Sequence, residues 1–350
     1  MNIQLAGSVL PVGPDHPVVV IAELSGNHNG DKERAIALLR AAKGAGADAV
    51  KLQTYTADTI TMDAPGSCFE IHAGPWKGRR LYDLYAEAST PWEWHPDLFA
   101  EAARLGLPCF STPFDPTAVD FLESLECPFY KVASFEVVDI PLLQRIAATR
   151  KPVVMSTGMA NLSEIDLAVR TLKNGGCSGL VLLNCVSAYP APAEAMHLGD
   201  IRRLAEAFAC PAGLSDHTLG ETAAVAAVAL GARLIEKHLT LRRADGGPDA
   251  GFSLEPEEFA SLVRVVRETE AAIRPSTAFG PGQADAGNLI FRKSLFASRD
   301  IATGEALSEA NVRSIRPGHG LPPADLPKVL GRCARTAIAR GTPLCWDLLG

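Results

Sequence analysis

The sequence lacks the patterns by which cysteine usually organises a protein. Eight cysteines are scattered over 350 residues, and no two of them form a C-x-x-C pair. This distribution predicts neither a zinc ribbon nor a disulfide framework, and it favours reduced thiols in a cytoplasmic protein. The first residues contain no basic leader, and Pro11 and Gly13 interrupt their short apolar stretch, so we expect no secretory signal.

Long apolar runs and an excess of positive charge are missing as well. No run approaches the roughly 20 apolar residues that a membrane-spanning helix needs. The formal net charge is -7 and no long Lys/Arg run occurs, which argues against binding to duplex nucleic acid or to a membrane surface. With 47% apolar and 21% charged residues, the chain is expected to fold around a substantial core.

Short apolar segments alternate with Ala- and Leu-rich helical patterns from residue 18 to about residue 274. The expected strands span residues 18–24, 49–54, 108–112, 130–134, 152–156, 180–185, 211–215 and 233–239. Such runs are typical of buried parallel strands, and eight strand–helix units predict an α/β fold, the (β/α)8 TIM barrel. An open doubly wound sheet is the alternative, but no G-x-G-x-x-G motif follows the first expected strand.

The chain is expected to contain two domains joined by a linker. We expect a barrel domain over residues 1–274, a Pro/Gly-rich linker over 275–288, and a small C-terminal domain over 289–350 in which the pattern I-x-x-G-x-x-L occurs twice. Residues 55–89 of the barrel are too long for an ordinary loop, and such insertions usually cover the active site. Thr90 and Pro91 form a capping signal, which predicts that a helix begins there.

Polar side chains gather where the expected strands end, which is where parallel barrels carry their catalytic groups. They are Glu23, Lys51, Gln53, Ser111, Thr112, Lys131, Ser134, Ser156, Asn184, Ser187, Tyr189, Ser215, His217, Glu236 and His238. Burying so many polar groups is unfavourable unless something binds them. The sequence therefore predicts a ligand site at this end of the barrel.

Two histidines of this set indicate a metal site. His217 and His238 are expected on neighbouring strands, close enough to share a cation, and neutral imidazoles are common metal ligands. Because no thiolate joins them, Mn²⁺ or Mg²⁺ is favoured over structural zinc. The alternative is a pair of hydrogen-bonded histidines without a metal.

Lysines and serines of the same set suggest an anion site, because ammonium groups supply charge and hydroxyls supply directed donors. They are Lys51, Lys131, Ser134, Ser156, Ser187 and Ser215. Alternatively, the lysines are only salt-bridge partners. Lys237, by alternation, is expected to face outward.

Glu23 ends the very apolar segment V-V-V-I-A-E. Burial of this kind perturbs the pKa of a carboxyl group and suits general acid–base catalysis. A structural hydrogen bond to the turn at residues 27–30 is the alternative.

These residues lie in motifs that resemble the sialic acid synthase family, the bacterial nonulosonic acid synthases. The motifs span nearly the whole chain: IAELSGNHNG, ADAVKLQTYT, YKVASFE, VMSTGMA, AYPAP, GLSDHT, IEKH, GGPD and, beyond the linker, IRPGHG. The C-terminal part resembles the antifreeze-like (SAF) domain that accompanies these barrels. LYDLYAEASTPWEWH, FSTPFDPTAVDFLE and FSLEPEEF are most similar to pseudaminic acid synthases.

The resemblance implies a metal-assisted condensation of phosphoenolpyruvate with a 2,4-diacetamido-2,4,6-trideoxy-altrose, which gives pseudaminic acid and inorganic phosphate. The related alternatives are N-acetylneuraminate and legionaminate synthases, which use the corresponding N-acetylmannosamine-type sugars. The implied cofactor is a divalent metal, Mn²⁺ first, with Mg²⁺ or Co²⁺ as alternatives.

The resemblance also assigns roles to residues. It implies that His217 and His238 hold the metal and that Glu23 is the catalytic carboxylate. Lys51, Lys131, Ser134, Ser156, Ser187 and Ser215 would bind phosphoenolpyruvate, and Gln53, Glu136, Tyr189, Asp249 and Arg316 would bind the sugar. Arg316 matches an arginine that reaches into a partner's barrel, which implies a homodimer with swapped C-terminal domains.

Two positions depart from the family pattern, and two other functions stay open. Asn184 stands where pseudaminate-forming relatives usually have lysine, and Arg242 stands where an acid is common. A Schiff-base aldolase that uses Lys51 or Lys131 is an alternative enzyme. A binding or scaffold protein whose C-terminal domain recognises a carbohydrate is an alternative of another class.

Overall fold

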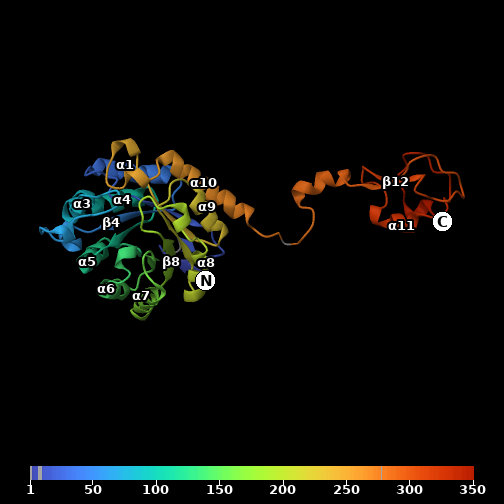
Figure 1. Cartoon of the computed structure of the whole chain (residues 1–350). Helices are drawn as coiled ribbons and strands as arrows, with labels where there is room; N and C mark the ends of the chain where they lie inside the picture. Colours follow the sequence, from blue (N-terminus) through green and yellow to red (C-terminus); the bar gives the residue numbers. More distant parts are fainter. Residues whose placement is uncertain (1, 7–9, 277) are drawn as a thin grey trace. The chain divides into compact units, whose positions relative to one another are not determined.

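The computed structural model describes residues 2–6, 10–276 and 278–350. The chain forms two compact units, Met1–Arg274 and Pro275–Gly350 (Figure 1). In the described part of the chain, no helix combines the length and the hydropathy needed to cross a bilayer.

The first unit is a closed barrel of parallel strands in the order β10-β3-β4-β5-β6-β7-β8-β9. The strands are β3 (Val19–Glu23), β4 (Ala49–Thr54), β5 (Cys109–Pro113), β6 (Tyr130–Val132), β7 (Val153–Ser156), β8 (Leu180–Cys185), β9 (Ala212–Asp216) and β10 (Leu234–His238). The last strand closes the barrel on the first, with His238 opposite Glu23. The predicted TIM barrel is therefore confirmed.

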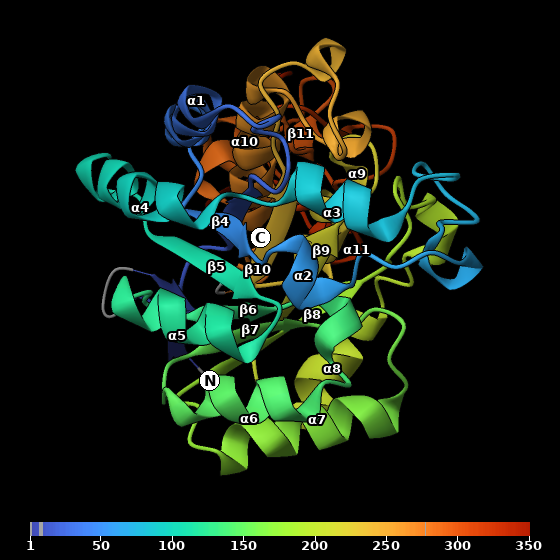
Figure 2. The ribbon, with the colours of Figure 1, turned by 90° about the vertical axis from the view of Figure 1, so that its left-hand side faces the viewer.

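Helices cover the outside of the strands (Figure 2). They are α1 (Lys32–Gly44), α4 (His95–Arg104), α5 (Pro116–Ser124), α6 (Ile140–Ala148), α7 (Leu162–Asn174), α8 (Asp200–Phe208), α9 (Thr222–Ala229) and α10 (Pro256–Ala272). Local sequence explains several of their starts. Asp31 accepts hydrogen bonds from the backbone N–H groups of Glu33 and Arg34, and Asn161 forms a capping box with Glu164.

The barrel core is apolar on both faces of the strands, because helices cover the outer face and side chains fill the interior. Every residue of β3 is buried, including Glu23 at its end. A two-stranded antiparallel sheet of β1 (Ile3–Gln4) and β2 (Pro11–Val12) precedes the barrel, and Ile3 and Val12 are buried in the same core.

At two places a 3-10 helix stands where the sequence predicted a strand or an α-helix. Strand β6 ends at Val132, and a 3-10 helix, Ser134–Glu136, follows it. The helix expected at Thr90 begins later: Pro91 is followed by a 3-10 turn, Trp92–Trp94, and α4 starts at His95. A capping signal also fits a 3-10 first turn, which is common at helix starts.

The insertion after β4 contains two helices, α2 (Ala57–Ile60) and α3 (Leu81–Ala88). In the second unit, a 3-10 helix, Gln283–Phe291, precedes a hairpin of β11 (Ser294–Ala297) and β12 (Val312–Ile315), and α11 (Leu326–Val329) follows. The two I-x-x-G-x-x-L segments lie side by side, because Ile301 and Ile338 form a β-bridge in which each N–H donates to the other's carbonyl.

Candidate active site

The barrel register brings the predicted polar residues to one end of the barrel. Glu23 lies opposite Lys51 on β4 and opposite His238 on β10. Glu236 lies opposite Ser215 on β9. Glu23 and His238 are the last residues of their strands and Ser215 is the last but one, whereas Lys51 and Glu236 lie in the middle of theirs.

Two lysines and two glutamates form a buried ionic network. Lys51 Nζ lies 2.6 Å from Glu23 Oε2 and 3.5 Å from Glu236 Oε1, and Lys131 Nζ lies 3.7 Å from the same Glu236 oxygen. All four side chains are at most 5% exposed. Gln53 Nε2 and the backbone N–H of Ser25 both donate to Glu23 Oε1, at 3.0 and 3.1 Å.

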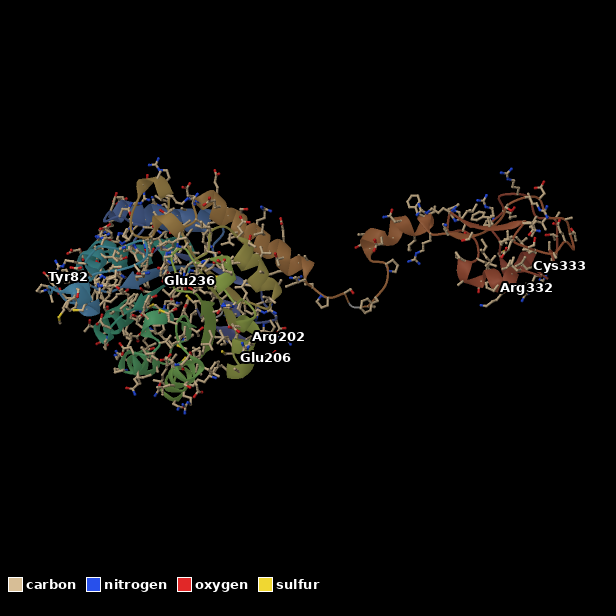
Figure 3. The ribbon with its side chains drawn as sticks, viewed as in Figure 1. Tyr82, Arg202, Glu206, Glu236, Arg332 and Cys333 are labelled. Carbon is tan, nitrogen blue, oxygen red and sulfur yellow. The ribbon has the colours of Figure 1, made fainter. Side chains whose placement is uncertain are left out.

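Glu236, which Figure 3 labels inside the barrel, lies at the centre of this network. It contacts both lysines, and it accepts a hydrogen bond from Ser215 Oγ at 3.3 Å. The sequence placed Glu236 among the polar strand-end residues, two before His238 on the same face of β10, but it assigned this residue no role.

Burial and the lysines set the protonation of the network. Burial raises the pKa of Glu23 to about 7, although Lys51 opposes the shift. Burial also acts on Glu236, but Lys131 and Lys51 outweigh it and hold its pKa below the ordinary value. Burial lowers the pKa of Lys131, whereas for Lys51 the two glutamates outweigh burial and raise the pKa. Glu23 is therefore the group of this network with a pKa near neutrality.

Hydroxyl groups surround Lys131. Lys131 Nζ donates to Ser156 Oγ at 2.7 Å, and the backbone N–H of Gly158 donates to Ser134 Oγ at 3.2 Å. A Cβ at Gly158 would lie 2.8 Å from Ser134 Oγ and 2.9 Å from Ser187 Oγ, so only glycine fits between them. Within the described residues, buried Ser187 Oγ has no hydrogen-bond partner. Such a group is satisfied when an anion accepts from it.

His217 and His238 face one another with ring centroids 5.4 Å apart. His217 Nδ1 lies 2.9 Å from the Val186 carbonyl and must donate to it, which leaves the Nε2 lone pair free; His238 Nδ1 lies 3.2 Å from Ser25 Oγ. Neither Nε2 makes a hydrogen bond to any residue that the structure describes. This is the arrangement in which a backbone or side-chain partner orients a metal-binding imidazole.

The protonation of the two imidazoles differs. Burial, reinforced by nearby positive charge, holds the pKa of His238 well below its ordinary value, so this ring is neutral. Burial also acts on His217, but its interactions with the neighbouring Cys185 outweigh burial and raise its pKa.

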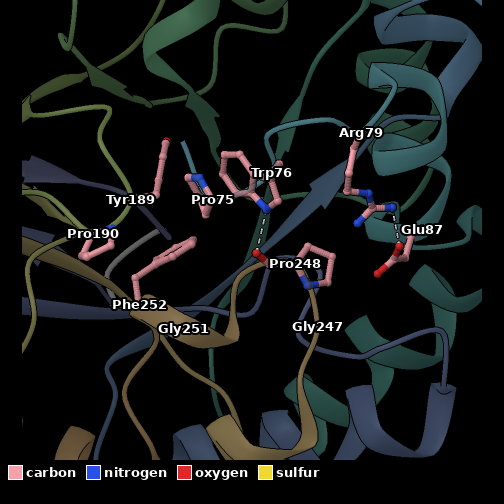
Figure 4. A pocket seen from close by; sticks show the side chains of 10 residues that line it. All are labelled: Pro75, Trp76, Arg79, Glu87, Tyr189, Pro190, Gly247, Pro248, Gly251 and Phe252. Carbon is pink, nitrogen blue, oxygen red and sulfur yellow. Dashed lines mark hydrogen bonds and ion pairs between the residues drawn. The ribbon is translucent and has the colours of Figure 1, made fainter. Parts of the chain in front are cut away.

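Figure 4 shows a cavity of about 410 Å³, and two of its lining residues, Tyr189 and Phe252, lie against the two histidines. Residues of the β4 insertion and of the loops after β8 and β10 line it: Pro75, Trp76, Arg79, Glu87, Tyr189, Pro190, Gly247, Pro248, Gly251 and Phe252. The insertion that was expected to cover the site thus forms one wall of this cavity.

Aromatic rings connect the cavity to the histidines. Between ring centroids, Tyr189 lies 4.5 Å from His217 and 5.4 Å from Trp76. The centroid of the Phe252 ring lies 5.0 Å from those of both His238 and Tyr189. Trp76 Nε1 donates to the Pro248 carbonyl at 2.9 Å, which fixes its indole. Sequence reasoning missed Trp76 and Phe252, because an aromatic residue in a loop carries no periodic signal.

The remaining sugar-site candidates are placed as follows. The carboxyl group of Glu136 has a buried oxygen without a partner in the described structure, and burial raises its pKa to about 7. Asp249 Oδ2 accepts from the backbone N–H of Gly26 at 3.4 Å. Arg316 follows β12 in the second unit, and its role in a shared site stays a prediction.

Three further positions lie outside the network. Asn184 is buried and donates to the Met196 carbonyl at 2.8 Å, so it holds the loop after β8. Arg242 is exposed and pairs with Asp245 at 2.7 Å. Lys237 is not part of the network around Glu236, as expected, yet it is completely buried and pairs with Asp216 at 2.7 Å.

A closed eight-stranded barrel with ionisable and hydroxyl groups gathered at the carboxyl ends of its strands has the architecture of a TIM-barrel enzyme. Comparison with protein families makes the assignment specific: residues 38–277 match the NeuB family and residues 292–350 match the SAF domain. The chain belongs to the NeuB family. This confirms the family predicted from the sequence motifs.

Relatives match the chain from end to end. A pseudaminic acid synthase of Campylobacter jejuni is 43% identical over 335 residues, which are 94% of this chain and 96% of the relative. An N,N'-diacetyllegionaminic acid synthase of Legionella pneumophila is 35% identical and covers 97% of this chain and 96% of its own length. Among solved structures, the spore coat polysaccharide biosynthesis protein SpsE of Bacillus subtilis aligns with a TM-score of 0.68 and 33% identity, over 100% of this chain and 99% of that one.

Proposed function

We propose that this enzyme condenses phosphoenolpyruvate with a 2,4-diacetamido-2,4,6-trideoxy hexose and releases pseudaminic acid and inorganic phosphate. The greater identity to the pseudaminic than to the legionaminic acid synthase supports this sugar over the alternatives. The observation that carries the proposal is the buried network of two lysines and two glutamates, beside unpartnered hydroxyl and imidazole groups.

His217 and His238 are proposed to hold a divalent cation, Mn²⁺ first and Mg²⁺ or Co²⁺ as alternatives. The two free Nε2 atoms of neighbouring imidazoles fit a borderline cation. Among the described residues no group of three or more His, Cys, Asp or Glu side chains has metal-site geometry, so water and substrate oxygens would complete the coordination. When bound, such an ion supplies Lewis-acid polarisation of a carbonyl oxygen.

The lysines and serines are proposed to bind the phosphate and carboxylate groups of phosphoenolpyruvate. Lys131 and Ser156 are already 2.7 Å apart, and the hydroxyl groups of Ser134 and Ser187 converge on Gly158. Charge-assisted hydrogen bonds of this kind are stronger than neutral ones. They would also orient C3 of the enol toward the sugar.

The reaction joins two carbon atoms and removes phosphate. C3 of phosphoenolpyruvate bonds to the aldehyde carbon of the sugar, whose oxygen takes up a proton. A water oxygen adds at C2 and loses its proton, and the C2–O bond then breaks so that phosphate leaves with the bridging oxygen. Glu23, with a pKa near 7, can stabilise positive charge developing at C2 and exchange the proton of this water.

The sugar is proposed to occupy the cavity beside the histidines, with its acetamido and methyl groups against Trp76, Tyr189 and Phe252. The aromatic rings form an apolar wall that matches the methyl groups of a deoxy sugar with N-acetyl substituents, and the Arg79–Glu87 ion pair supplies polar groups in the same cavity. Glu136 and Asp249 are placed to accept from hydroxyl or amide donors.

A homodimer with swapped SAF domains is part of the proposal. The loops after β6 and β7 expose apolar side chains at the carboxyl end of the barrel: Phe135, Val138, Met159 and Leu162 are 57–66% exposed. Exposed apolar groups at the rim of an active site are typical of a surface that another protein unit covers. Arg316 of the partner subunit would then complete the sugar site.

The test is a panel of acetamido sugars incubated with phosphoenolpyruvate and Mn²⁺, followed by phosphate release and mass spectrometry of the product. We expect the 2,4-diacetamido-2,4,6-trideoxy-altrose to give the highest kcat/KM. Release of phosphate only with N-acetylmannosamine would contradict the sugar assignment, and no release with any sugar would contradict the reaction.

A Schiff-base aldolase is tested on the same samples with borohydride. The raised pKa of Lys51 keeps its amine protonated and therefore a poor nucleophile, whereas burial lowers the pKa of Lys131, so Lys131 is the lysine at which a Schiff base would be trapped. We expect no covalent trapping with substrate, and loss of turnover in EDTA that added Mn²⁺ restores. Trapping together with full activity in chelator would favour the aldolase.

A further inference from the structure

Lys237 and Asp216 form a buried ion pair next to the two histidines. Lys237 Nζ lies 2.7 Å from Asp216 Oδ2, and neither side chain is exposed to solvent. The two residues are register partners on β10 and β9, and they directly precede His238 and His217. Because successive residues of a strand face opposite sides, the pair lies on the side of the sheet away from the imidazoles.

The same two residues also form hydrogen bonds to Thr218, the residue that follows His217. Lys237 Nζ donates to the carbonyl of Thr218, and Asp216 Oδ1 accepts from the backbone N–H and the hydroxyl of Thr218, at 2.9 and 2.8 Å. The side chain that precedes His238 is therefore bonded to both chain neighbours of His217.

Stability alone explains this arrangement poorly. Replacing a buried ion pair with apolar side chains of similar volume is often neutral or stabilising, because desolvation offsets the attraction between the charges. What the pair does provide is a fixed separation between the ends of two strands that each carry an imidazole. Partners of this kind around metal-binding side chains commonly tune metal affinity.

We propose that Asp216 and Lys237 are positioning residues that fix the separation and orientation of His217 and His238 for one shared divalent cation. The inference rests on the proposed metal site and deepens it. It assigns a function to two charged residues that touch neither substrate, and it concerns the geometry of the site rather than its chemistry.

The experiment uses the full-length double variant Asp216→Asn/Lys237→Met. Asparagine keeps the acceptor for Thr218, and methionine fills the space of the lysine stem, so the charges are removed with little change in volume. Mn²⁺ binding is measured from the loss of the free-ion electron paramagnetic resonance signal, and thermal unfolding is followed in EDTA. We expect the Kd for Mn²⁺ to rise roughly ten- to a hundredfold, while unfolding in EDTA changes little. Saturating Mn²⁺ should recover kcat, with the KM for phosphoenolpyruvate unchanged.

The matched control is Asp48→Asn/Arg267→Met. This removes another ion pair of 2.7 Å, one that lies before β4 and far from the strand ends that carry the histidines. Its Kd for Mn²⁺ should equal that of the parent. A milder variant, Thr218→Val, removes only one hydrogen bond to Asp216 and should raise the Kd by a smaller factor.

The His238→Ala variant distinguishes a failure of the positioning role from a failure of the proposed metal site. If His238→Ala loses Mn²⁺ binding but the folded Asp216→Asn/Lys237→Met and Thr218→Val proteins bind within twofold of the parent, the positioning role is overturned and the metal site stands. If the parent and His238→Ala bind Mn²⁺ equally, the proposed metal site is wrong and the inference falls with it.

Discussion

Glu23 combines three properties in one side chain. It is completely buried, it is held by Gln53 and by the backbone of Ser25, and it lies 2.6 Å from an ammonium group. Burial nevertheless raises its pKa to about 7, so the group can release or take up a proton at physiological pH. An acid with a poised pKa and a fixed position is what general acid–base catalysis requires.

Glu23→Gln is expected to lower kcat by roughly 10²–10⁴-fold, because glutamine keeps the shape and loses the ionisable group. The KM values, the thermal midpoint and Mn²⁺ binding should change little, since the metal is assigned to His217 and His238. Steady-state kinetics and a thermal melt on the same preparation check this. Near-normal turnover would remove Glu23 from the mechanism.

Trp76→Ala is expected to raise the KM for the sugar about tenfold, equivalent to about 1.4 kcal/mol of lost aromatic contact. The KM for phosphoenolpyruvate should stay constant and serves as an internal control. The preference for a 6-deoxy over a 6-hydroxy sugar should also fall, because the apolar wall that leaves a hydroxyl unpaired is removed. An unchanged sugar preference would show that the discriminating contact lies elsewhere.

At the level of single residues, the sequence indicated where the site lies better than which groups form it. Lysine, serine and histidine at strand ends were informative because burying them is unfavourable without a partner. Glu236 was named among the strand-end residues but given no role, because the sequence does not show which neighbours a carboxylate will contact. Trp76 was overlooked because a long insertion has no register to place its side chains.

The barrel strands could be predicted because their burial pattern repeats along the chain. Short irregular elements were less predictable, because they have no such repeat. All eight barrel strands lie within one or two residues of the expected ranges, because burial on both faces demands continuous apolar runs. Strand β6 is the exception in kind: it ends at Val132, and the 3-10 helix Ser134–Glu136 then places Ser134 and Glu136. Short 3-10 turns depend on local contacts that a hydrophobic pattern does not encode.

The start of α4 contains a buried histidine with a consequence for stability. His95 is completely buried; its Nε2 lies 2.9 Å from Thr54 Oγ1 and its Nδ1 3.2 Å from the Pro91 carbonyl. Burial lowers its pKa from 6.5 to about 4, despite hydrogen bonding to the backbone. The unfolded chain therefore binds this proton more readily than the folded one, so stability falls as pH decreases from about 6.5 toward 4.

We expect this histidine to cost the fold about 3 kcal/mol between those pH values, from the difference between its two pKa values. In His95→Gln the slope of unfolding free energy against pH should be shallower over the same range. Urea titrations at a series of pH values check this, with the exposed His72→Gln as the control. Parallel slopes for all three proteins would contradict it.

At the scale of the whole chain, the family likeness carried information that physical patterning did not. Periodicity predicted a barrel followed by a small domain, and the family comparison confirms both the barrel and the SAF domain. The proposed sharing of sites between subunits cannot be read from one chain, because the contact would be between two copies. It therefore requires an experiment on mixed subunits.

Mixing Arg316→Ala with Glu23→Gln is expected to restore activity. In a swapped dimer, the barrel of the Arg316→Ala subunit keeps Glu23 and receives Arg316 of the partner subunit, so one of its two sites is intact. The Arg316→Ala homodimer alone should show a raised sugar KM. The Glu23→Gln homodimer alone should show almost no turnover. After unfolding and refolding the mixture, recovery toward half of the parental activity per heterodimer is expected. Recovery no greater than the sum of the two separate proteins would contradict the exchange.

The carboxylate of Glu236 also has a consequence for phosphate release, if Lys51 and Lys131 bind the phosphate group as proposed. Glu236 Oε1 lies 3.5 Å from Lys51 Nζ and 3.7 Å from Lys131 Nζ. The two ammonium groups therefore keep a counterion from the protein when no substrate or product is bound. A free inorganic phosphate ion thus competes with a resident negative charge for both lysines. Because of this competition, we expect inorganic phosphate to be a weak product inhibitor. Turnover should then continue as phosphate accumulates in solution.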